Sequence, residues 1–329
     1  MTDPRGAQSV QASRAKVLAA FAAVYIVWGS TYLAIRYAVE TIPPFIMVGT
    51  RFIVSGTLLY AWARMRGDQR PTAAQWRDAT IIGILMLCLG NGAVSWAEQR
   101  VPSGLAALLA AVVPLWMVLL DWLRPHGTRP RLLVMAGVIV GMAGLVVLIG
   151  VDSFCLGFLE RFCEGSRASS ANAVDIVGAI ALIAGSLAWA AGSIYTRYGT
   201  VPDSAVMSTG VQMIGGSVAL LFVGAARGEL AMIHPDQISA RSLEGWFYLV
   251  TFGSLLGFTA YVYLLQNVSP AKASTYAYVN PLVAVLLGWA IAGETVTSRT
   301  LAAAAIILGG VAMITLTQNG ARVKATSGD

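Results

Sequence analysis

Apolar residues along the chain gather in ten long stretches, which short polar connections separate. An α-helix needs roughly 20 predominantly apolar residues to cross the hydrocarbon core of a bilayer. The pattern therefore predicts ten membrane-spanning helices, near residues 17–38, 44–63, 78–97, 103–123, 131–150, 174–196, 204–226, 243–265, 271–292 and 299–318. The first stretch is longer than the apolar part of a typical signal peptide and lacks a clear cleavage site, so we expect it to be retained.

The composition points to lipid as the solvent. Hydrophobic residues make up 57% of the 329 residues and charged residues 12%, whereas soluble domains carry about a quarter charged residues. The net charge of +6 comes from clusters of basic residues between the apolar stretches. This is the positive-inside pattern of membrane proteins, so nucleic acid is not an expected partner. The composition predicts an all-α membrane protein.

The placement of Lys and Arg predicts the orientation. With a cytoplasmic N-terminus and ten crossings, fourteen basic residues fall on the cytoplasmic side and seven on the other, with Arg51 inside a stretch. This excess predicts that both termini are cytoplasmic. Cys155 and Cys163 would then lie in an extracytoplasmic loop, where a disulfide and two free thiols are both open. Cys88 lies within a stretch and is expected to be a packing residue.

The two halves of the sequence resemble each other. Trp28 matches Trp189 at an offset of 161 residues, and from the third stretch onward the offset is 167. The second offset relates three further pairs: Gly90 with Gly257, Pro114 with Pro281, and Trp122 with Trp289. Each half holds five stretches, an odd number, so the halves would insert in opposite senses. Inverted repeats are typical of secondary transporters, whose substrate site lies near the bilayer midplane between the halves.

Several short motifs occur in the two halves. They are YIVWGSTY at 25–32, GNGAV at 90–94, VPSG at 101–104, NVSPA at 267–271, YAYVNP at 276–281, and Gly293-Glu294. These runs resemble the EamA-type carriers of the drug/metabolite transporter superfamily, most closely their YedA-like members. The resemblance implies ten helices in two five-helix inverted repeats, cytoplasmic termini and a bacterial inner-membrane location. It also implies export of small metabolites, usually amino acids or related amphipathic compounds.

The resemblance also implies a division of the chain. It predicts a cytoplasmic tail at 1–16, a first repeat at 17–150, an extracytoplasmic loop at 151–173, a second repeat at 174–318 and a cytoplasmic tail at 319–329. The loop is longer than is usual for such carriers. Because it is an outer connection, its length is not expected to alter the transport core.

Arg51 is a candidate substrate-binding residue because an arginine inside a span is costly. Its insertion costs on the order of 2.5–3.5 kcal/mol at a helix centre, so the side chain should face protein or water. Its guanidinium can hold a carboxylate with two parallel hydrogen bonds. The alternatives are pairing with backbone carbonyls or reaching the outer surface from a span that begins near Pro44.

Aromatic residues predict a cavity between the halves. Trp28 and Tyr32 are four residues apart and share one helix face, and Trp189 and Ser193 repeat that face in the second half. Two such faces meeting across the pseudo-two-fold axis would suit an amphipathic solute. The alternative is that both tryptophans only pack helices together, with small neighbours allowing close approach.

Three polar residues within spans are further candidates. Asn91 and Glu98 lie on roughly one face of the third stretch, and Gln212 lies in the seventh. Polar groups inside a membrane need partners and often mark a solute path. Glu98 is the candidate for proton coupling, the alternative being a solvated residue at the outer end. Asn91 and Gln212 are candidate substrate-binding residues.

The ninth stretch holds Tyr276 and Asn280 directly before Pro281, and Pro114 occupies the corresponding place in the fourth. Proline frees a backbone carbonyl one turn earlier, which a polar neighbour or a substrate can satisfy. The paired prolines predict symmetric kinks used in gating, and static packing kinks are the alternative. Tyr276 and Asn280 are candidate substrate-binding residues.

Signatures of enzymes are absent from the sequence. The two histidines, His126 and His234, lie in connections without clustered cysteines or carboxylates, so no metal site or cofactor is expected. There is no Walker phosphate loop, so an ion or solute gradient, with the proton as candidate ion, is the expected energy source. Two other functions stay open: a flippase for lipid carriers with the same fold, and a regulatory membrane protein that binds its ligand without moving it. The sequence predicts no oligomeric state.

Overall fold

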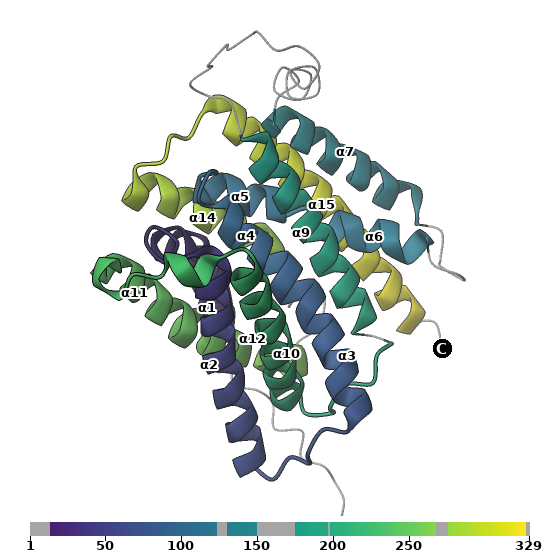
Figure 1. Ribbon diagram of the computed structural model, residues 1–329. Helices are drawn as coiled ribbons and strands as arrows, with labels where there is room; N and C mark the ends of the chain where they lie inside the picture. The colour runs from purple at the N-terminus through teal and green to yellow at the C-terminus, as the bar shows by residue number, and fades with distance from the viewer. Residues whose placement is uncertain (1–13, 124–129, 150–174, 197, 268–275, 327–329) are drawn as a thin grey trace, which may run out of the picture.

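The computed structural model describes residues 14–123, 130–149, 175–196, 198–267 and 276–326. All regular elements within these ranges are helices, and they pack side by side as tilted rods (Figure 1). Cys155 and Cys163, with the whole of the 151–173 loop, lie outside the described residues. The choice between a disulfide and two free thiols therefore stays open.

The described residues of the first half form seven α-helices and one π-helical segment. In order they are α1 (Arg14–Ala38), α2 (Pro44–Met65), α3 (Ala73–Gly83), η1 (Ile84–Asn91), α4 (Gly92–Ala97), α5 (Ser103–Ala110), α6 (Val113–Leu123) and α7 (Leu132–Ile149). Here α3, η1 and α4 form one continuous rod, so these helices cover the first five predicted stretches.

The described residues of the second half form six α-helices, two short 3₁₀ turns and one π-helical segment. Its elements are α9 (Ile176–Tyr195), α10 (Ala205–Ala226), two short 3₁₀ turns η2 (Glu229–Met232) and η3 (Pro235–Gln237), α11 (Ala240–Tyr248), the π-helical segment η4 (Leu249–Leu256), α12 (Gly257–Asn267), α14 (Tyr276–Ala292) and α15 (Ser298–Thr326). α11, η4 and α12 form one rod whose middle part, η4, is π-helical, and the rod of α3, η1 and α4 likewise contains the π-helical segment η1. π-helical segments are rare in proteins, and many of those that occur lie at functional sites.

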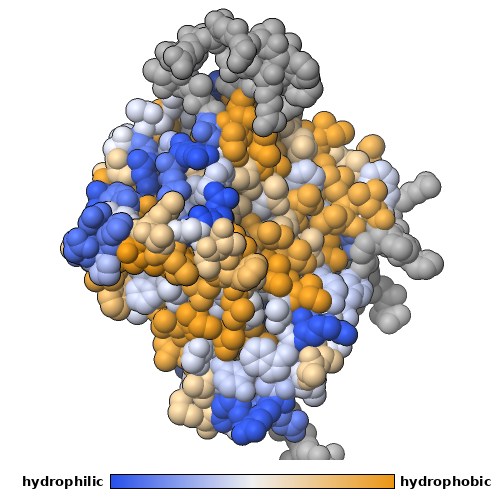
Figure 2. Space-filling model, in the orientation of Figure 1, coloured by the Kyte–Doolittle hydropathy of each residue, from blue (hydrophilic) through white to orange (hydrophobic). Residues whose placement is uncertain are grey.

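Among the described residues, seven helices are long and apolar enough to cross a membrane. They coincide with the first seven predicted stretches and confirm an all-α membrane architecture. The remaining three stretches are helical wherever they are described, and their crossing stays a prediction. Large apolar side chains face outward along these helices; Leu132, for example, is 89% exposed. Figure 2 shows the resulting hydrophobic surface, which lipid would cover.

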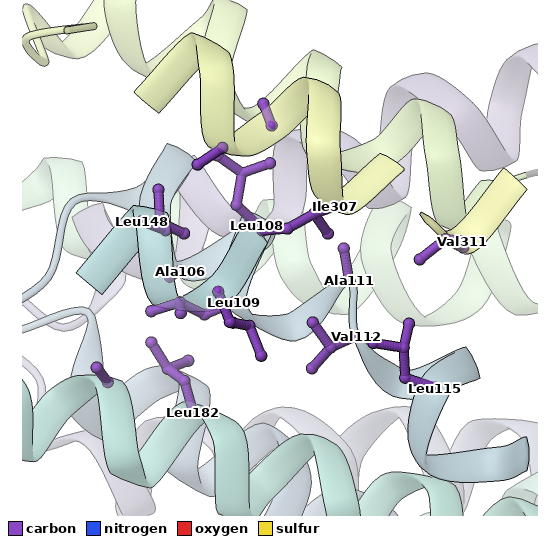
Figure 3. Close-up of a cluster of buried hydrophobic side chains, with 14 of the residues drawn as sticks. Ala106, Leu108, Leu109, Ala111, Val112, Leu115, Leu148, Leu182, Ile307 and Val311 are labelled. Atoms are coloured by element: carbon purple, nitrogen blue, oxygen red, sulfur yellow. The ribbon is translucent and has the colours of Figure 1, made fainter. Parts of the chain in front are cut away.

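Helices from the two halves are interleaved. α2 lies along α10, and α7 lies along α15. α1 packs on α14 and α12 of the second half, while α9 packs on η1 and on α5 and α6 of the first. The largest apolar cluster lies where α5, α7, α9 and α15 meet, and includes Leu109, Leu148, Leu182 and Ile307 (Figure 3).

The contact between α7 and α15 depends on glycine. A methyl group on Gly310 would lie 2.6 Å from the carbonyl oxygen of Gly137 and 2.6 Å from the amide nitrogen of Gly141, whereas one on the neighbouring Gly309 would meet nothing within 4 Å. We expect Gly310→Ala to lower stability by about 1–3 kcal/mol, because backbone atoms cannot move aside for the added carbon. Thermal unfolding in detergent would measure this, with Gly309→Ala as the matched control. Equal melting temperatures for the two variants would contradict the packing.

Candidate functional site

Arg51 lies near the middle of α2 and is 4% exposed. Its Nε donates a hydrogen bond to Oγ of Ser254 in η4 at 3.0 Å, and its guanidinium lies 4.7 Å from the centroid of the Phe52 ring. Its Nη1 is buried without a hydrogen-bond partner, and no acidic side chain among the described residues pairs with it. The structure thus holds a buried cation with an unused donor, which is the arrangement an anionic group would complete.

Trp28 is the centre of an aromatic cluster. Its ring centroid lies 5.5 Å from that of Phe258, 5.1 Å from that of Tyr261 and 5.2 Å from that of Tyr276. The indole Nε1 donates to the carbonyl oxygen of Gly253 at 3.1 Å. The cluster therefore joins α1, α12 and α14 beside η4.

Arg51 and Trp28 meet the same turn of η4, which contains Gly253 and Ser254. A methyl group on Gly253 would lie 3.1 Å from Nη2 of Arg51, so the glycine permits the guanidinium to approach the π-helical backbone. The structure brings Arg51, Trp28 and Tyr276 to one region, and their binding of a common solute stays a prediction. Ser254 joins them and was not distinguished in the sequence.

Tyr32 and Asn280 extend this region along α1 and α14. Tyr32 is half-buried one turn beyond Trp28, within electrostatic range of both Glu98 and Tyr276. Asn280 is 8% exposed and its Oδ1 has no hydrogen-bond partner. A methyl group on Gly29 would lie 3.2 Å from the carbonyl oxygen of Asn280, which shows how closely α1 and α14 approach.

Four other candidate residues lie outside this region, in η1, α9 and α10. Ser193 donates to the carbonyl oxygen of Trp189 at 2.8 Å, and Nε2 of Gln212 donates to Oγ of Ser208 at 3.0 Å, so both side chains bond within their own helices. Asn91 is half-buried at the end of η1. Trp28 and Trp189 pack in two separate apolar clusters, and a cavity shared by the two tryptophans stays a prediction.

Each tryptophan instead packs on a glycine of the opposite half. A methyl group on Gly90 would lie 3.0 Å from Cε3 of Trp189, and one on Gly257 would collide with the indole nitrogen of Trp28. Gly90 is the last residue but one of the π-helical segment η1, and Gly257 directly follows η4. The internal repeat relates Trp28 to Trp189 and Gly90 to Gly257.

Glu294 makes the densest polar cluster, at the end of the bundle where α1 ends. Its carboxylate accepts hydrogen bonds from Nη1 of Arg36, from the amide nitrogen of Ser103 at 2.7 Å, from Oγ of Ser103 at 2.8 Å and from the amide nitrogen of Gly104 at 3.0 Å. A carboxylate suits this place because the first amides of a helix have no partners within it. We call Arg36, Ser103, Gly104 and Glu294 the Glu294 cluster.

The position of Glu294 follows from the glycine before it. Gly293 has φ of 65° and ends α14 in a left-handed conformation that favours glycine. The next amide, that of Glu294, then bonds back to the carbonyl oxygen of Gly288 at 2.9 Å. The pair Gly293-Glu294 was visible in the sequence only as a family motif, because its partners lie about 190 residues away in the chain.

Glu98 lies beside the Glu294 cluster, directly after α4. The residue is 5% exposed, and neither carboxylate oxygen has a hydrogen-bond partner. It lies within electrostatic range of Arg36 and Glu294. The sequence left open whether Glu98 is merely solvated at a helix end, and its burial argues against that alternative.

The two prolines occupy different local structures. Pro114 is the second residue of α6, after a break in the helix at Ala111 and Val112, whereas Pro281 lies inside the continuous helix α14. The fourth stretch is therefore divided in two, whereas the described part of the ninth, residues 276–292, is one helix. A role for either proline in gating stays a prediction.

These features define a class of protein: a multi-pass helical membrane protein with uncompensated charges buried among its helices. The EamA-like transporter family matches residues 15–150 and 176–316, and the chain belongs to this family. It is therefore a membrane transporter of the bacterial inner membrane, and its expected cargo is a small molecule.

Known relatives agree with this assignment. The uncharacterized inner membrane transporter YedA of Escherichia coli K12 is 39% identical over 298 residues, which are 89% of each chain. Protein PecM of Dickeya dadantii is 26% identical over 80% of each chain. A solved crystal structure with 21% identity has a similar fold, with a TM-score of 0.60 over 93% of this chain and 99% of its own.

Proposed function

We propose that this protein is a secondary transporter that exports a small amphipathic metabolite of the amino-acid class by alternating access. In this proposal ten helices cross the inner membrane with both termini in the cytoplasm. Residues 17–150 and 174–318 form two five-helix inverted repeats, joined by an extracytoplasmic loop at 151–173 and flanked by cytoplasmic tails at 1–16 and 319–329. The Glu294 cluster then lies at the outer end of the bundle.

The reciprocal packing of the two tryptophans carries this proposal. Trp28 contacts Gly257 and Trp189 contacts Gly90, and exchanging the halves by the repeat offsets converts one contact into the other. Two inverted units with equivalent contacts can exchange conformations, so that an inward-open arrangement becomes an outward-open one. A receptor or a scaffold gains nothing comparable from this symmetry.

Two hydrogen bonds support our proposal of which helices move together during transport. Near one end of the bundle, Oγ of Ser242 in α11 donates to the carbonyl oxygen of Tyr37 in α1 at 2.8 Å. Near the opposite end, the amide of Thr200, after α9, donates to Asp78 in α3 at 2.7 Å. We infer that α1 moves with the rod of α11 and α12, and that α9 moves with the rod of α3 and α4.

The proposed substrate site is chemically one-sided. In the second stretch the repeat offset is 160 residues, as between Met47 and Met207, so Arg51 corresponds to Val211. Ser254 corresponds to Leu87, and both Val211 and Leu87 are buried and apolar. The arginine and the hydroxyl group to which it donates therefore have no polar counterparts in the other half. We assign substrate recognition to Arg51, Trp28, Tyr32, Tyr276 and Asn280, with Arg51 binding a carboxylate. Asn91, Trp189, Ser193 and Gln212 remain candidate lining residues of the opposite wall.

Proton antiport is the proposed energy source, with Glu98 as the proton-carrying group. A buried carboxylate without hydrogen bonds can hold a proton at modest cost, since its charged form is poorly solvated. We expect Glu98→Gln to reduce pH-gradient-driven transport to the level seen without a gradient, because the amide cannot ionise. Full gradient-driven transport by Glu98→Gln would remove this residue from the coupling mechanism.

Exchange in proteoliposomes tests the proposed function. Purified protein would be reconstituted, and uptake of each labelled standard amino acid would be followed with and without a pH gradient. Saturable exchange of one chemical class of amino acid is the expected result. Failure of any amino acid to move through demonstrably folded protein would overturn the substrate class and favour lipid carriers or other metabolites. Binding without movement would favour a regulatory role.

A further inference from the structure

We propose that Arg36 is the outer gate of the transporter and exchanges between two carboxylates. It bonds to Glu294 when Glu98 carries a proton, and to Glu98 when that proton is lost. The inference rests on the proposed function, in which Glu98 carries the coupling proton, and it adds the step by which this proton controls access from the outer side.

Arg36 lies between the proposed substrate site and the outer solution. Trp28, Tyr32 and Arg36 follow one another at intervals of four residues and share one face of α1. Beyond them a hollow of about 440 Å³ has Arg36 in its lining, and the side chain of Arg36 is 35% exposed. The bond from Arg36 to Glu294 joins α1 to the connection between α14 and α15. We infer that this bond closes the way from the hollow to the substrate site.

Glu98 is the second carboxylate that Arg36 can bind. Both of its carboxylate oxygens are buried without a hydrogen-bond partner, and the residue lies within electrostatic range of Arg36 and Glu294. A buried carboxylate without donors is stable in this place while it is protonated, but loss of the proton leaves an uncompensated charge. That charge attracts the guanidinium of Arg36, whose partly exposed side chain is free to turn.

Glu294 can release Arg36 because it has other hydrogen bonds. The amide nitrogen and Oγ of Ser103 and the amide nitrogen of Gly104 donate to its carboxylate, and the start of α5 favours a negative charge. Glu98 has no such donors. A charged Glu98 therefore gains more from the guanidinium than Glu294 loses, and the outer end opens between α1 and the connection from α14 to α15.

Three other polar groups lie near Glu98. Tyr32 faces it from α1 within electrostatic range and is uncharged at neutral pH. Glu40 lines the hollow and pairs with Arg241 at 3.6 Å. Arg100 also lines the hollow, and its guanidinium lies 4.4 Å from the centroid of the Trp96 ring. Arg100 is thus the alternative cation for a charged Glu98, and the experiment below separates it from Arg36.

The exchange gives the order of events that proton-coupled export requires. With Glu98 charged, the outer end is open and the substrate leaves. Glu98 then takes up a proton from the outer solution, Arg36 returns to Glu294, and the outer end closes before the inner end opens. The structure shows the closed gate, with Arg36 bonded to Glu294 and the oxygens of Glu98 without partners.

The test is the labelling of a thiol introduced behind the gate. Ala107 lies one turn after Ser103 on the same face of α5 and is 1% exposed. The full-length Ala107→Cys protein, with Cys88, Cys155 and Cys163 replaced by serine, would be reconstituted in proteoliposomes. A charged, membrane-impermeant methanethiosulfonate reagent would be applied at values from about pH 5 to about pH 9.

The same protein with Glu98→Gln provides the reference at each pH, since the comparison cancels the titration of the thiol itself. Glutamine cannot ionise, so Arg36 should stay on Glu294 throughout. We expect equal labelling rates at low pH and a roughly tenfold faster rate with Glu98 than with Glu98→Gln at high pH. Equal rates at every pH would overturn the switch.

Further variants identify the groups. Glu98→Asp keeps a titratable carboxylate and should retain the rise in labelling with pH. Arg36→Gln removes the gate bond and should label rapidly at every pH; slow labelling of this variant would overturn closure by Arg36 and Glu294. Glu40→Gln and Arg100→Gln are the matched controls and should retain the rise. Loss of the rise in Arg100→Gln would overturn the role of Arg36 and assign the exchange to Arg100.

The outcomes distinguish the switch from the proposed function. Amino-acid exchange without a Glu98-dependent rise in labelling would overturn the switch and leave amino-acid transport standing. A Glu98-dependent rise without exchange of any amino acid would support the switch and overturn the proposed substrate class.

Discussion

Replacing Arg51 by glutamine is expected to reduce solute exchange by roughly 100-fold, because the removed guanidinium is the proposed partner of the substrate carboxylate. Loss of a charged hydrogen-bond partner in a buried site costs roughly 2–5 kcal/mol of binding free energy, and 1.4 kcal/mol corresponds to tenfold. The apparent affinity in proteoliposome exchange would measure the effect. The apparent affinity for a deaminated substrate that keeps its carboxylate should fall by the same factor in Arg51→Gln.

The same substitution is expected to leave the protein at least as stable as its parent. Arg51 is 4% exposed and has an unpartnered Nη1, and a buried charge without a counter-ion opposes folding. Glutamine removes that charge and can still donate to Ser254. Thermal unfolding in detergent would measure this, and the opposite signs of the two effects separate function from folding.

Arg51→Lys is the informative companion variant. Lysine keeps the positive charge but lacks the planar fork that binds a carboxylate through two hydrogen bonds. We expect the exchange activity of Arg51→Lys to lie between that of the parent and that of Arg51→Gln. Unchanged affinity in both variants would show that Arg51 has only a structural role, and the proposed substrate site would then be misplaced.

The second large effect is expected at Glu294, where alanine should lower stability by about 3 kcal/mol. Removing one partner of a buried ion pair costs about 3–5 kcal/mol. We expect the lower end because the side chain of Arg36 is 35% exposed and can be solvated when its partner is lost. The amides of Ser103 and Gly104 would also lose their acceptor at the start of α5. The measurement is thermal unfolding of the purified protein.

Two further variants define the cause. Glu294→Gln keeps one oxygen that can accept from the amides of α5, so it should lose less stability than alanine. Glu40→Gln removes an acid from the exposed pair with Arg241, and such surface pairs contribute about 0–1 kcal/mol. Equal losses for Glu294→Ala and Glu40→Gln would show that the Glu294 cluster does not hold α1, α5 and the end of α14 together.

The positions of the helices were predictable because the physical constraint is local. Crossing a bilayer requires about 20 consecutive apolar residues whose backbone groups bond within one helix, and this is visible in any window of the sequence. The first seven predicted stretches accordingly match helices to within a few residues, as with 44–63 and the helix Pro44–Met65. The same pattern placed Arg51 within the second stretch, but it left open whether the side chain is buried.

The partners of the polar groups depended on tertiary packing. Arg51 and Ser254 are 203 residues apart, and Glu294 is 191 residues from Ser103; no local pattern indicates that these residues meet. The repeat relates Trp28 to Trp189, and a shared cavity was the natural expectation. The structure packs each tryptophan on a glycine of the opposite half instead. Sequence spacing specifies which face of a helix a side chain occupies, but the interleaving of two halves decides what that face contacts.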